Sequence, residues 1–379
     1  MRIVRIEART VWVDLVKPYV TADYKGGGMA GKPVVILRLY TDDGSCGLGE
    51  ADPYPTFTYE SPEAVMQMIR DHLGPAVLGM DPANVAGLHV KMDAALPGWP
   101  FAKAPIDVAA YDLQAQALGV PVHKLLGGQV RDRIPMIWPI GGGTPEENAR
   151  ESRLMVEEGF GSLHVKLGAL TPEEDIARLA AIRRAVGDHI PLMVDVNQGW
   201  DRATAVRTIH KLAQFNLSII EQPVPAWDMT GMAQIQAEVD TPISADESLH
   251  SLQDGMNLIR QDAARIFSLK TGKCGGLFRT RQVAAMAEAA GMPCFVNSMI
   301  EMGISVAASL HLAACVPNLA NIGHALMSNL RIKEDILVEG SFHYDGKDIL
   351  VPQECTGLGV AVDEVKLAAR TIDQFELVL

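Results

Sequence analysis

The 379-residue chain is 48% hydrophobic and 21% charged, and it carries a formal net charge of −13 at pH 7. This length suggests two domains, one of them large, with a sizeable core. The acidic balance argues against nucleic acid or an anionic membrane as a partner. It does not exclude a small anionic substrate whose site supplies its own cation.

The sequence carries no targeting or membrane signal. Its first residues lack the apolar region of a signal peptide, and no run of roughly 18 apolar residues occurs. The five cysteines are scattered without a CxxC spacing, which is typical of reduced thiols in a cytoplasm. We therefore expect a soluble, cytoplasmic protein.

The first fifty residues are typical of β-structure. Apolar runs at Ile3–Ile6 and Val11–Val13 predict a first pair of strands, and residues 33–40 predict another strand. Glycine-rich and aromatic segments then predict two loops, at residues 21–31 and 51–60.

The apolar period becomes helical after these strands. Ser61 followed by Pro62 is typical of a helix start, with serine as the cap and proline in the first turn. Three helices are predicted, at about residues 61–73, 83–95 and 102–118. We expect this front part to be an α+β unit that ends near residue 128.

From Pro135 onwards strands and helices alternate. The predicted strands lie at about residues 135–140, 162–167, 191–196, 217–221, 241–246, 264–270, 293–298 and 319–325. The predicted helices lie at about residues 144–159, 171–186, 201–215, 228–239, 251–262, 276–290 and 304–315. Eight βα units with apolar strands favour a closed (β/α)8-type barrel over an open sheet. Beyond these units, residues 341–379 predict a short hairpin and a C-terminal segment that packs back on the front unit.

Five polar residues end successive strands of this barrel. They are Lys166, Asp195, Glu221, Asp246 and Lys270, and the gaps between them are 29, 26, 25 and 24 residues. One strand, one helix and two loops need about that many residues. Because catalytic residues of such barrels come from the C-terminal ends of the strands, we expect these five side chains to meet at one mouth.

The three carboxylates come from consecutive strands. Adjacent carboxylates repel one another and need a cation to stay ionised together. Three oxygen ligands, Asp195, Glu221 and Asp246, suit Mg²⁺ better than Zn²⁺, which prefers histidine or cysteine. The alternative is that each carboxylate merely caps the helix after it. Because three carboxylates occur in three consecutive βα units, the metal site is favoured over helix capping.

The two lysines lie on strands 2 and 6, and hence on opposite walls of an eight-stranded barrel. Burial or a nearby cation lowers the pKa of a lysine. Lys166 or Lys270 could then take a proton from the carbon next to a metal-bound carboxylate. The alternative is that each lysine only forms a structural ion pair with a ligand carboxylate.

Three further residues neighbour this set. His164 lies two residues before Lys166 and so points to the same inward face. Two interpretations stay open for it: it sets the pKa or position of Lys166, or it is a satisfied core histidine. Asn197 and Glu247 follow the carboxylate strands directly, so we expect them to orient the ligands.

The combination resembles the enolase superfamily in its mandelate racemase/muconate-lactonizing-enzyme subgroup. The segments that carry the resemblance span nearly the whole chain and comprise residues 47–50, 102–113, 195–197, 221–223, 246–248, 270–276 and 298–301. The resemblance implies a modified TIM barrel at residues 129–340, an α+β capping domain at 1–128, and a segment at 341–379 that completes the capping domain. It also implies Mg²⁺, or Mn²⁺, on the three carboxylates, the two lysines as the acid/base pair, and a metal-stabilised enediolate.

One position departs from the subgroup's pattern. Where the subgroup usually has Lys-x-Lys, this chain has His164-Val165-Lys166. Lys270 stands where the mandelate-racemase and sugar-acid-dehydratase subgroups have an aspartate partnered with a histidine, which argues against both. We expect a racemase or epimerase of a proline-like or N-substituted amino acid. A dehydratase, such as one acting on a hydroxyproline, or a muconate-type cycloisomerase using one lysine stays open, as does an inactive carboxylate-binding or scaffold barrel.

The resemblance also implies that capping-domain loops around residues 19–29 and 54–59 close over a small carboxylate substrate. Tyr54, Phe57, Tyr59 and Trp138 could form an aromatic wall for an apolar or quaternary-ammonium group, or simply pack. His324 would touch substrate or brace Glu301. The candidate substrate contacts are Tyr19, Tyr54, Phe57, Trp138, Asn297, Ser298, Glu301 and His324. A homo-oligomer, from dimer to octamer, is expected.

Overall fold

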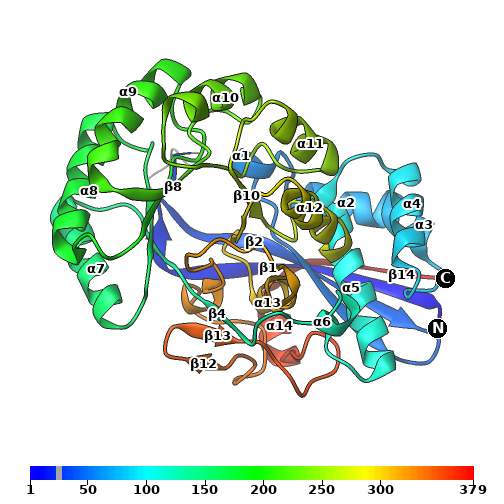
Figure 1. Ribbon diagram of the computed structural model, residues 1–379. Helices are drawn as coiled ribbons and strands as arrows, with labels where there is room; N and C mark the ends of the chain where they lie inside the picture. Colours follow the sequence, from blue (N-terminus) through cyan, green and yellow to red (C-terminus); the bar gives the residue numbers. More distant parts are fainter. Residues whose placement is uncertain (23–27) are drawn as a thin grey trace.

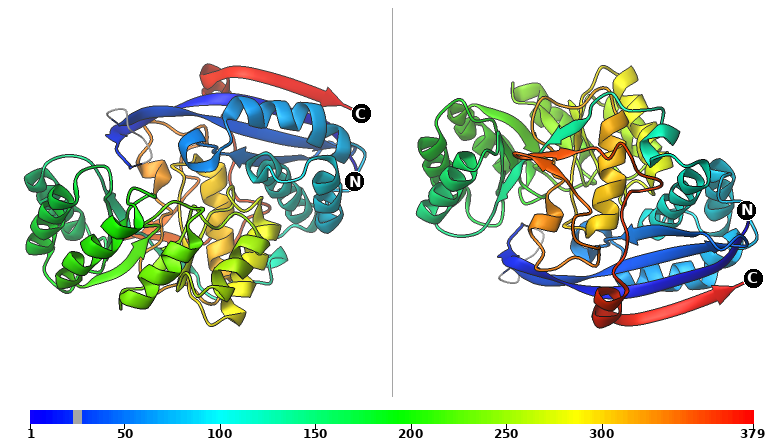
Figure 2. Two further views of the ribbon diagram at one scale, coloured as in Figure 1. Left: turned by 90° about the horizontal axis from the view of Figure 1, so that it is seen from above. Right: turned by 90° about the horizontal axis from the view of Figure 1, so that it is seen from below.

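The computed structural model describes residues 1–22 and 28–379, so part of the predicted glycine-rich loop lies outside the described residues. An antiparallel sheet with its helices sits beside a barrel of βα units (Figure 1). Seen from above and below, the sheet lies along one side of the barrel, and the C-terminal strand runs along the outer edge of the sheet (Figure 2). Within the described residues no helix is long and apolar enough to cross a membrane.

The antiparallel sheet joins the two ends of the chain. Its strand order is β14-β1-β2-β3, with bounds β14 (Thr371–Val378), β1 (Ile3–Tyr19), β2 (Met29–Thr41) and β3 (Cys46–Ala51). β14 pairs antiparallel with β1 from Arg5 to Val11. This pairing confirms the prediction that the C-terminal segment completes the capping domain.

The predicted pair of short strands at the N-terminus is wrong, because β1 is one strand of 17 residues. It pairs with β2 without a turn from Arg5 to Asp14. The residues between the two apolar runs, Glu7–Thr10, include no glycine or proline, so the chain has no reason to turn there.

Helices follow the first three strands of this sheet in the chain. They are α1 (Pro55–Thr58), α2 (Pro62–Met68), η1 (Ile69–Leu73), α3 (Gly74–Val77), α4 (Val85–Ala95), α5 (Pro100–Leu118) and α6 (Val122–Leu125). Among them, α2 and α5 pack on the sheet. Ser61 caps α2 as predicted, since its hydroxyl accepts a hydrogen bond from the Ala64 N–H. The buried acids of α5 reach outside their own helix. Asp112 accepts from the N–H groups of Leu48 (2.9 Å) and Leu358 (2.8 Å).

Seven parallel strands form the barrel wall in the order β11 to β5. They are β5 (Trp138–Ile140), β6 (Leu163–Lys166), β7 (Leu192–Asp195), β8 (Leu217–Glu221), β9 (Ile243–Ala245), β10 (Ile266–Leu269) and β11 (Cys294–Val296). One helix follows each strand in turn: α7 (Pro145–Glu157), α8 (Pro172–Val186), α9 (Arg202–Leu212), α10 (Met229–Glu238), α11 (Leu252–Arg260), α12 (Leu277–Ala289) and α13 (Gly303–Cys315), with the short η2 (Ala213–Phe215) after α9. The predicted barrel is confirmed.

The eighth predicted strand closes this barrel without forming a regular strand. Residues 319–325 make only isolated bridges, from Leu319 to Cys294 and from His324 to Met136. Two tight turns interrupt the extended backbone. In the first, the Ile322 N–H donates to the Ala320 carbonyl, and in the second, the Leu326 N–H donates to the His324 carbonyl. The prediction of a strand here is therefore wrong, although the segment lies where that strand would.

The first predicted barrel strand is divided between two sheets. Pro135, its first residue, ends β4 (Arg133–Pro135), which pairs with β13 (Asp348–Leu350), and β13 forms a hairpin with β12 (Tyr344–Asp345). Only β5 pairs with the barrel. The predicted hairpin after the barrel is thus present, and its second strand, β13, pairs antiparallel with β4.

One buried acid beneath the capping helices predicts a pH-dependent stability. Glu60 is 7% exposed and accepts a hydrogen bond from the Phe101 N–H (3.3 Å) in the first turn of α5. Burial raises its pKa to about 7. Because the folded-state pKa exceeds the unfolded one, the contribution of Glu60 to stability is complete below pH 4.5 and lost as the pH rises through about 7.

The free energy of unfolding of Glu60→Gln should therefore rise relative to that of the wild type as the pH increases. The expected change in this difference is about 3 kcal/mol between roughly pH 4.5 and 8. Urea unfolding at several pH values measures this difference. The exposed Glu339→Gln is the matched control. A difference between wild type and Glu60→Gln that stays constant with pH would contradict the shifted pKa.

Candidate active site

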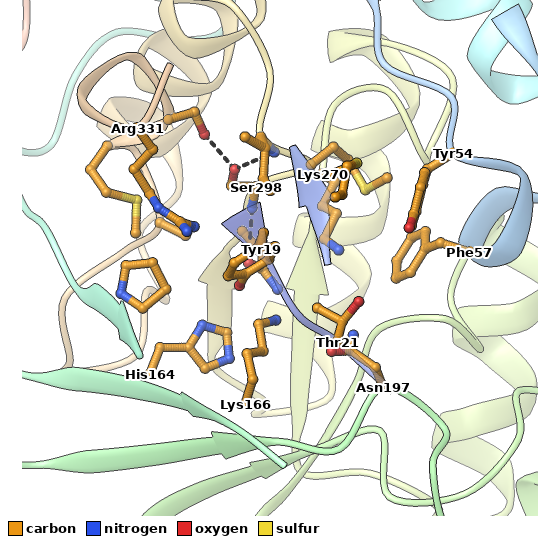
Figure 3. Close-up of a pocket in the computed structure, with 18 residues that line it drawn as sticks. Tyr19, Thr21, Tyr54, Phe57, His164, Lys166, Asn197, Lys270, Ser298 and Arg331 are labelled. Carbon is orange, nitrogen blue, oxygen red and sulfur yellow. Dashed lines mark hydrogen bonds between the residues drawn. The ribbon is translucent and has the colours of Figure 1, made fainter. Parts of the chain in front are cut away.

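A cavity of about 70 Å³ opens at the C-terminal ends of the barrel strands, beneath loops of the antiparallel sheet (Figure 3). The predicted site residues that line it are Tyr19, Tyr54, Phe57, His164, Lys166, Asn197, Lys270, Asn297 and Ser298. The structure thus brings residues from strands 2, 3, 6 and 7 of the barrel together with two loops of the capping domain.

The two lysines enter this cavity from different walls, as predicted. Lys166 ends β6 and ion-pairs with Asp195, whereas Lys270 follows β10 and its Nζ lies 2.6 Å from Asp246 Oδ2. Burial by itself lowers the pKa of Lys166, but the neighbouring carboxylates of Asp195 and Glu221 outweigh it and hold that pKa well above its ordinary value. The pKa of Lys270 is raised in the same way, burial notwithstanding, chiefly by Asp246. The pKa of each lysine is thus shifted opposite to the direction that burial alone would give.

The three carboxylates are buried side by side at the strand ends. Asp195 and Glu221 are direct partners across β7 and β8, and Asp246 follows β9. The Asn297 side-chain amide donates to Glu221 Oε1 (2.9 Å) and lies 3.4 Å from Asp246 Oδ2. Burial, then the charges of the other two acids, raise the pKa of Glu221 well above its ordinary range. The site thus concentrates negative charge where it is poorly solvated.

His164 faces two of these carboxylates. Its Nε2 lies 3.2 Å from Glu221 Oε2 and 3.7 Å from Asp195 Oδ2, and the imidazole is 2% exposed. Burial, then Lys166 and Lys270, hold its pKa well below the ordinary value. The Nε2 atom has no well-formed hydrogen bond to the described residues. His164 therefore faces the carboxylates with an Nε2 that lacks a hydrogen-bond partner among the described residues, which a satisfied core histidine would have.

The tightest group of potential ligand atoms differs from the predicted set. His164, Asp195 and Glu221 offer atoms within 4.8 Å of one another. The Asp246 oxygens instead face two lysines, Lys270 and Lys273. Asp246 remains on the same wall through its contact with Asn297.

Sequence reasoning missed Lys273, which is fully buried. Its Nζ contacts Asp246 Oδ1 (2.7 Å), the Asp246 carbonyl (2.7 Å) and the Ser268 carbonyl (3.0 Å). Burial alone would raise the pKa of Asp246, but the ammonium groups of Lys270 and Lys273 lower it below its ordinary range. The available signal was a second lysine three residues after Lys270, just past the end of the same strand.

A glutamine behind the carboxylates was missed as well. The Gln222 side-chain carbonyl accepts from the Asp246 N–H (3.0 Å) and the Ser248 hydroxyl (2.9 Å). Its backbone lies in the left-handed region at φ 34°. Gln222 therefore fixes the chain just after Glu221 against the chain at Asp246.

Asn197 and Glu247 lie beside the carboxylates as expected. The Asn197 N–H donates to Asp195 Oδ1 (2.8 Å), and its side-chain amide donates to Glu247 Oε1 (3.2 Å). Asn197 has φ 43°, a conformation that asparagine tolerates better than most residues. These contacts orient Asp195, and Asn197 also lines the cavity.

The turn after β11 places Ser298 in the cavity wall but turns Glu301 away. Glu301 Oε2 accepts from the Ser298 hydroxyl (2.7 Å) and the Met299 N–H (2.6 Å). Ile300 has φ 59°, which is strained for a β-branched residue. Lys32, from the antiparallel sheet, donates to the Met299 carbonyl (2.6 Å), so the capping domain holds this turn.

Three proposed substrate contacts do not line the cavity. Besides Glu301, these are Trp138, whose indole N–H donates to Glu151 Oε1 (3.2 Å), and His324, whose Nδ1 accepts from the Val296 N–H (3.1 Å). His324 lines a separate hollow together with Pro135, and burial lowers its pKa to about 3. Within the described residues His324 thus lies outside the cavity lining, and its Nδ1 is bound to the backbone of β11 and not to Glu301.

The fold and the site together define a capped (β/α)-barrel enzyme with buried carboxylates between two lysines. Residues 147–366 match the family described as enolase C-terminal domain-like, and residues 5–127 match the mandelate racemase/muconate lactonizing enzyme N-terminal domain. The chain belongs to the mandelate racemase/muconate lactonizing enzyme family of the enolase superfamily.

Characterised relatives of this chain are isomerases. An N-succinyl-L-Arg/Lys racemase of Bacillus cereus is 33% identical over 99% of both chains, and its crystal structure superposes with a TM-score of 0.94 over 100% of both. Muconate cycloisomerase 1 of Rhodococcus opacus is 34% identical over 98% of this chain and 99% of its own. An L-Ala-D/L-Glu epimerase of Bacillus subtilis is 34% identical over 95% of this chain and 97% of its own. The predicted enzyme class is confirmed.

Proposed function

We propose that the protein is a divalent-metal-dependent racemase or epimerase that removes and returns the α-proton of an N-substituted or proline-like amino acid. The observation that carries this proposal is the pair of lysines, Lys166 and Lys270, which enter one cavity from different walls. A base on each side of the α-carbon lets the proton leave from one face and return on the other. The racemase and epimerase relatives support the same reaction class.

The donor set fits a divalent cation. Asp195, Glu221 and Asp246 would hold it, and their oxygens favour Mg²⁺ or Mn²⁺. The fit rests on Asp195 and Glu221, whose oxygens lie with His164 Nε2 within 4.8 Å of one another, and this Nε2 has no hydrogen-bond partner among the described residues. When bound, the cation would neutralise charge that develops on the substrate carboxylate as the proton leaves.

Within this scheme the other residues position the acids and the bases. Asn297 ties Glu221 to Asp246, and Lys273 holds Asp246 from behind. The capping-domain residues Tyr54 and Phe57 cover the side of the cavity near Lys270 and exclude water there (Figure 3). We expect these residues to fix geometry rather than to exchange protons.

A muconate-type cycloisomerase is the second candidate. The cycloisomerase relatives are as similar to this chain as the racemases are, at 34% identity. One lysine would suffice as the acid or base for that reaction. His164 in place of the subgroup's first lysine is compatible with either scheme, because Lys166 is retained.

The test is α-hydrogen exchange in D₂O followed by NMR, with Mg²⁺ present. The panel contains N-acyl amino acids, proline betaine, hydroxyprolines, dipeptides and muconate. Exchange in both enantiomers of an N-substituted or proline-like amino acid supports the proposal. Lactone formation from muconate without such exchange would replace it by the cycloisomerase, and loss of water from a hydroxyproline by a dehydratase. No turnover of any compound would favour an inactive barrel.

Metal binding gives a separate prediction. Mg²⁺ at about 100 times its dissociation constant should stabilise the protein by about 2.7 kcal/mol, which raises Tm by about 3 °C, and EDTA should reverse the change. Asp195→Asn should remove the response, whereas Asp373→Asn, at an exposed position on β14, should keep it. A thermal-shift titration measures both. An identical response from wild type and Asp195→Asn would leave the metal site unsupported.

We also propose a cytoplasmic location, supported by the five cysteines, all of which are unpaired. The homo-oligomer stays a prediction.

A further inference from the structure

A cation that sequence reasoning did not single out lines the same cavity. Arg331 directly follows η3 (Ser328–Leu330), and its side chain points into the cavity on the side of His164, across from Tyr54 and Phe57 (Figure 3). Its guanidinium carbon lies 4.2 Å from the centre of the Tyr19 ring. Arg331 thus rests on a capping-domain residue while it remains partly open to the cavity.

Arg331 has no acidic partner among the described residues. Lys166 and Lys270 each contact a carboxylate, but no carboxylate within the described ranges lies within 4.0 Å of the Arg331 guanidinium. No described group accepts a hydrogen bond from its side chain either. A guanidinium presents five N–H donors in a planar fork that matches a carboxylate. An arginine left unpaired in a binding cavity is therefore available to an anionic ligand.

The two lysines of the cavity, unlike Arg331, are paired with carboxylates: Lys166 with Asp195 and Lys270 with Asp246. Lys166 Nζ lies 5.8 Å from the centre of the same Tyr19 ring that carries Arg331. The Tyr19 ring thus lies near both Lys166 and Arg331. A substrate whose α-carbon lies between the lysines would extend past Tyr19 to reach the guanidinium.

We propose that Arg331 binds a second anionic group of the substrate, a carboxylate remote from the reacting carbon. This inference rests on the proposed function and narrows its substrate class to acidic N-acyl amino acids and similar dicarboxylates. Arg331 is thereby a specificity-determining residue. It takes no part in proton transfer.

The same geometry disfavours a quaternary-ammonium substrate. The Phe57 ring, part of the expected aromatic wall, already carries Lys270 Nζ at 4.0 Å from its centre. One face of this ring is therefore already occupied by a protein cation, which would repel a ligand cation placed nearby. A cationic ligand would in addition meet the unpaired Arg331.

The experiment compares two substrates that differ only in one charge: an N-succinyl amino acid and its uncharged succinamide counterpart. Racemisation and α-hydrogen exchange are measured for wild type, Arg331→Gln and Arg331→Lys. Arg207→Gln, an exposed arginine on α9, is the matched control. Arg331→Lys keeps the charge but loses the planar fork.

Wild type should prefer the succinyl compound in kcat/KM by roughly 10- to 100-fold, because hydrogen bonds to charged groups carry that much discrimination. Arg331→Gln should lose the preference through a higher KM with kcat little changed, Arg331→Lys should retain part of it, and Arg207→Gln all of it. Equal turnover of both compounds by wild type and Arg331→Gln would overturn the inference while the proposed function stands.

Calorimetry measures the affinity of each protein for the two compounds without requiring turnover. It therefore tests anion binding at Arg331 independently of the proposed reaction. If neither compound exchanges its α-hydrogen, the proposed function fails for this substrate class. A weaker binding of the succinyl compound to Arg331→Gln, with unchanged binding of the succinamide, would then still support an anion contact at Arg331. Equal binding of both compounds by both proteins would overturn it.

Discussion

Replacement of either lysine by alanine is expected to reduce racemisation by about 1,000-fold or more, because each lysine serves one face of the α-carbon and general acid–base catalysis contributes about 10²- to 10⁴-fold. The two variants should nevertheless differ. Lys166→Ala should still exchange the α-hydrogen of one enantiomer in D₂O, and Lys270→Ala that of the other. Exchange that survives in opposite enantiomers is a pattern that loss of the fold cannot produce.

NMR of each enantiomer in D₂O, with chiral analysis of the product, measures both quantities. Lys333→Ala, at an exposed position outside the cavity, is the matched control and should behave as wild type. If exchange of both enantiomers survived in both variants, neither lysine would be a base. If both variants lost all exchange, a two-base scheme would give way to one in which the lysines act together on one face.

Substitution of Gly49 by alanine is expected to destabilise the protein by about 3 kcal/mol or more. A Cβ at this position in β3 would lie 2.0 Å from the Pro105 carbonyl oxygen, and one at Gly47 would lie 2.2 Å from the Ala109 carbonyl oxygen. Both obstacles are backbone atoms of α5, so relief requires the helix to move as a unit. Gly47 and Gly49 thus allow the helix to lie directly on the strand.

The movement of β3 relative to α5 in Gly49→Ala should also alter the candidate site. Glu50, next to Gly49, accepts from the N–H groups of Met302 (2.6 Å) and Ser305 (2.9 Å) at the start of α13. Gly49→Ala should therefore shift the turn that carries Ser298, and raise KM as well as lower stability. Urea unfolding and steady-state kinetics measure the two effects.

Gly161→Ala provides the matched control, because a Cβ there meets no atom within 4 Å and the residue has no left-handed φ. It should lie close to wild type in both measurements. Equal stability of Gly49→Ala and Gly161→Ala would show that α5 can retreat from β3 at little cost.

The strand ends of the barrel were predictable because each parallel strand is a short apolar run that a polar residue ends, and because the βα spacing is nearly constant. Lys166, Asp195 and Glu221 each end a strand, as the spacing indicated. The eighth strand was not predictable in detail. Its local turns satisfy backbone groups within the segment itself, and apolar content does not reveal that alternative.

The direction of individual side chains was harder to predict. Trp138 and Glu301 occur in segments whose neighbours line the cavity, yet one side chain donates to Glu151 and the other folds back on the turn of Ser298. Arg331 follows a short irregular segment with no periodic pattern, so nothing in the sequence pointed it toward the cavity. Such orientations depend on contacts between residues far apart in the chain.

The sequence by itself determined the barrel, its cap, and the order of carboxylates and lysines along the strands, because spacing and period are local properties of a chain. Only the tertiary structure decided what these groups face. It directed Asp246 to Lys270 and Lys273, turned His164 onto Asp195 and Glu221, and placed Arg331 in the cavity without an acidic partner among the described residues. Charges and pKa values in a buried site depend on distances across the barrel, and those distances exist only once the chain has closed.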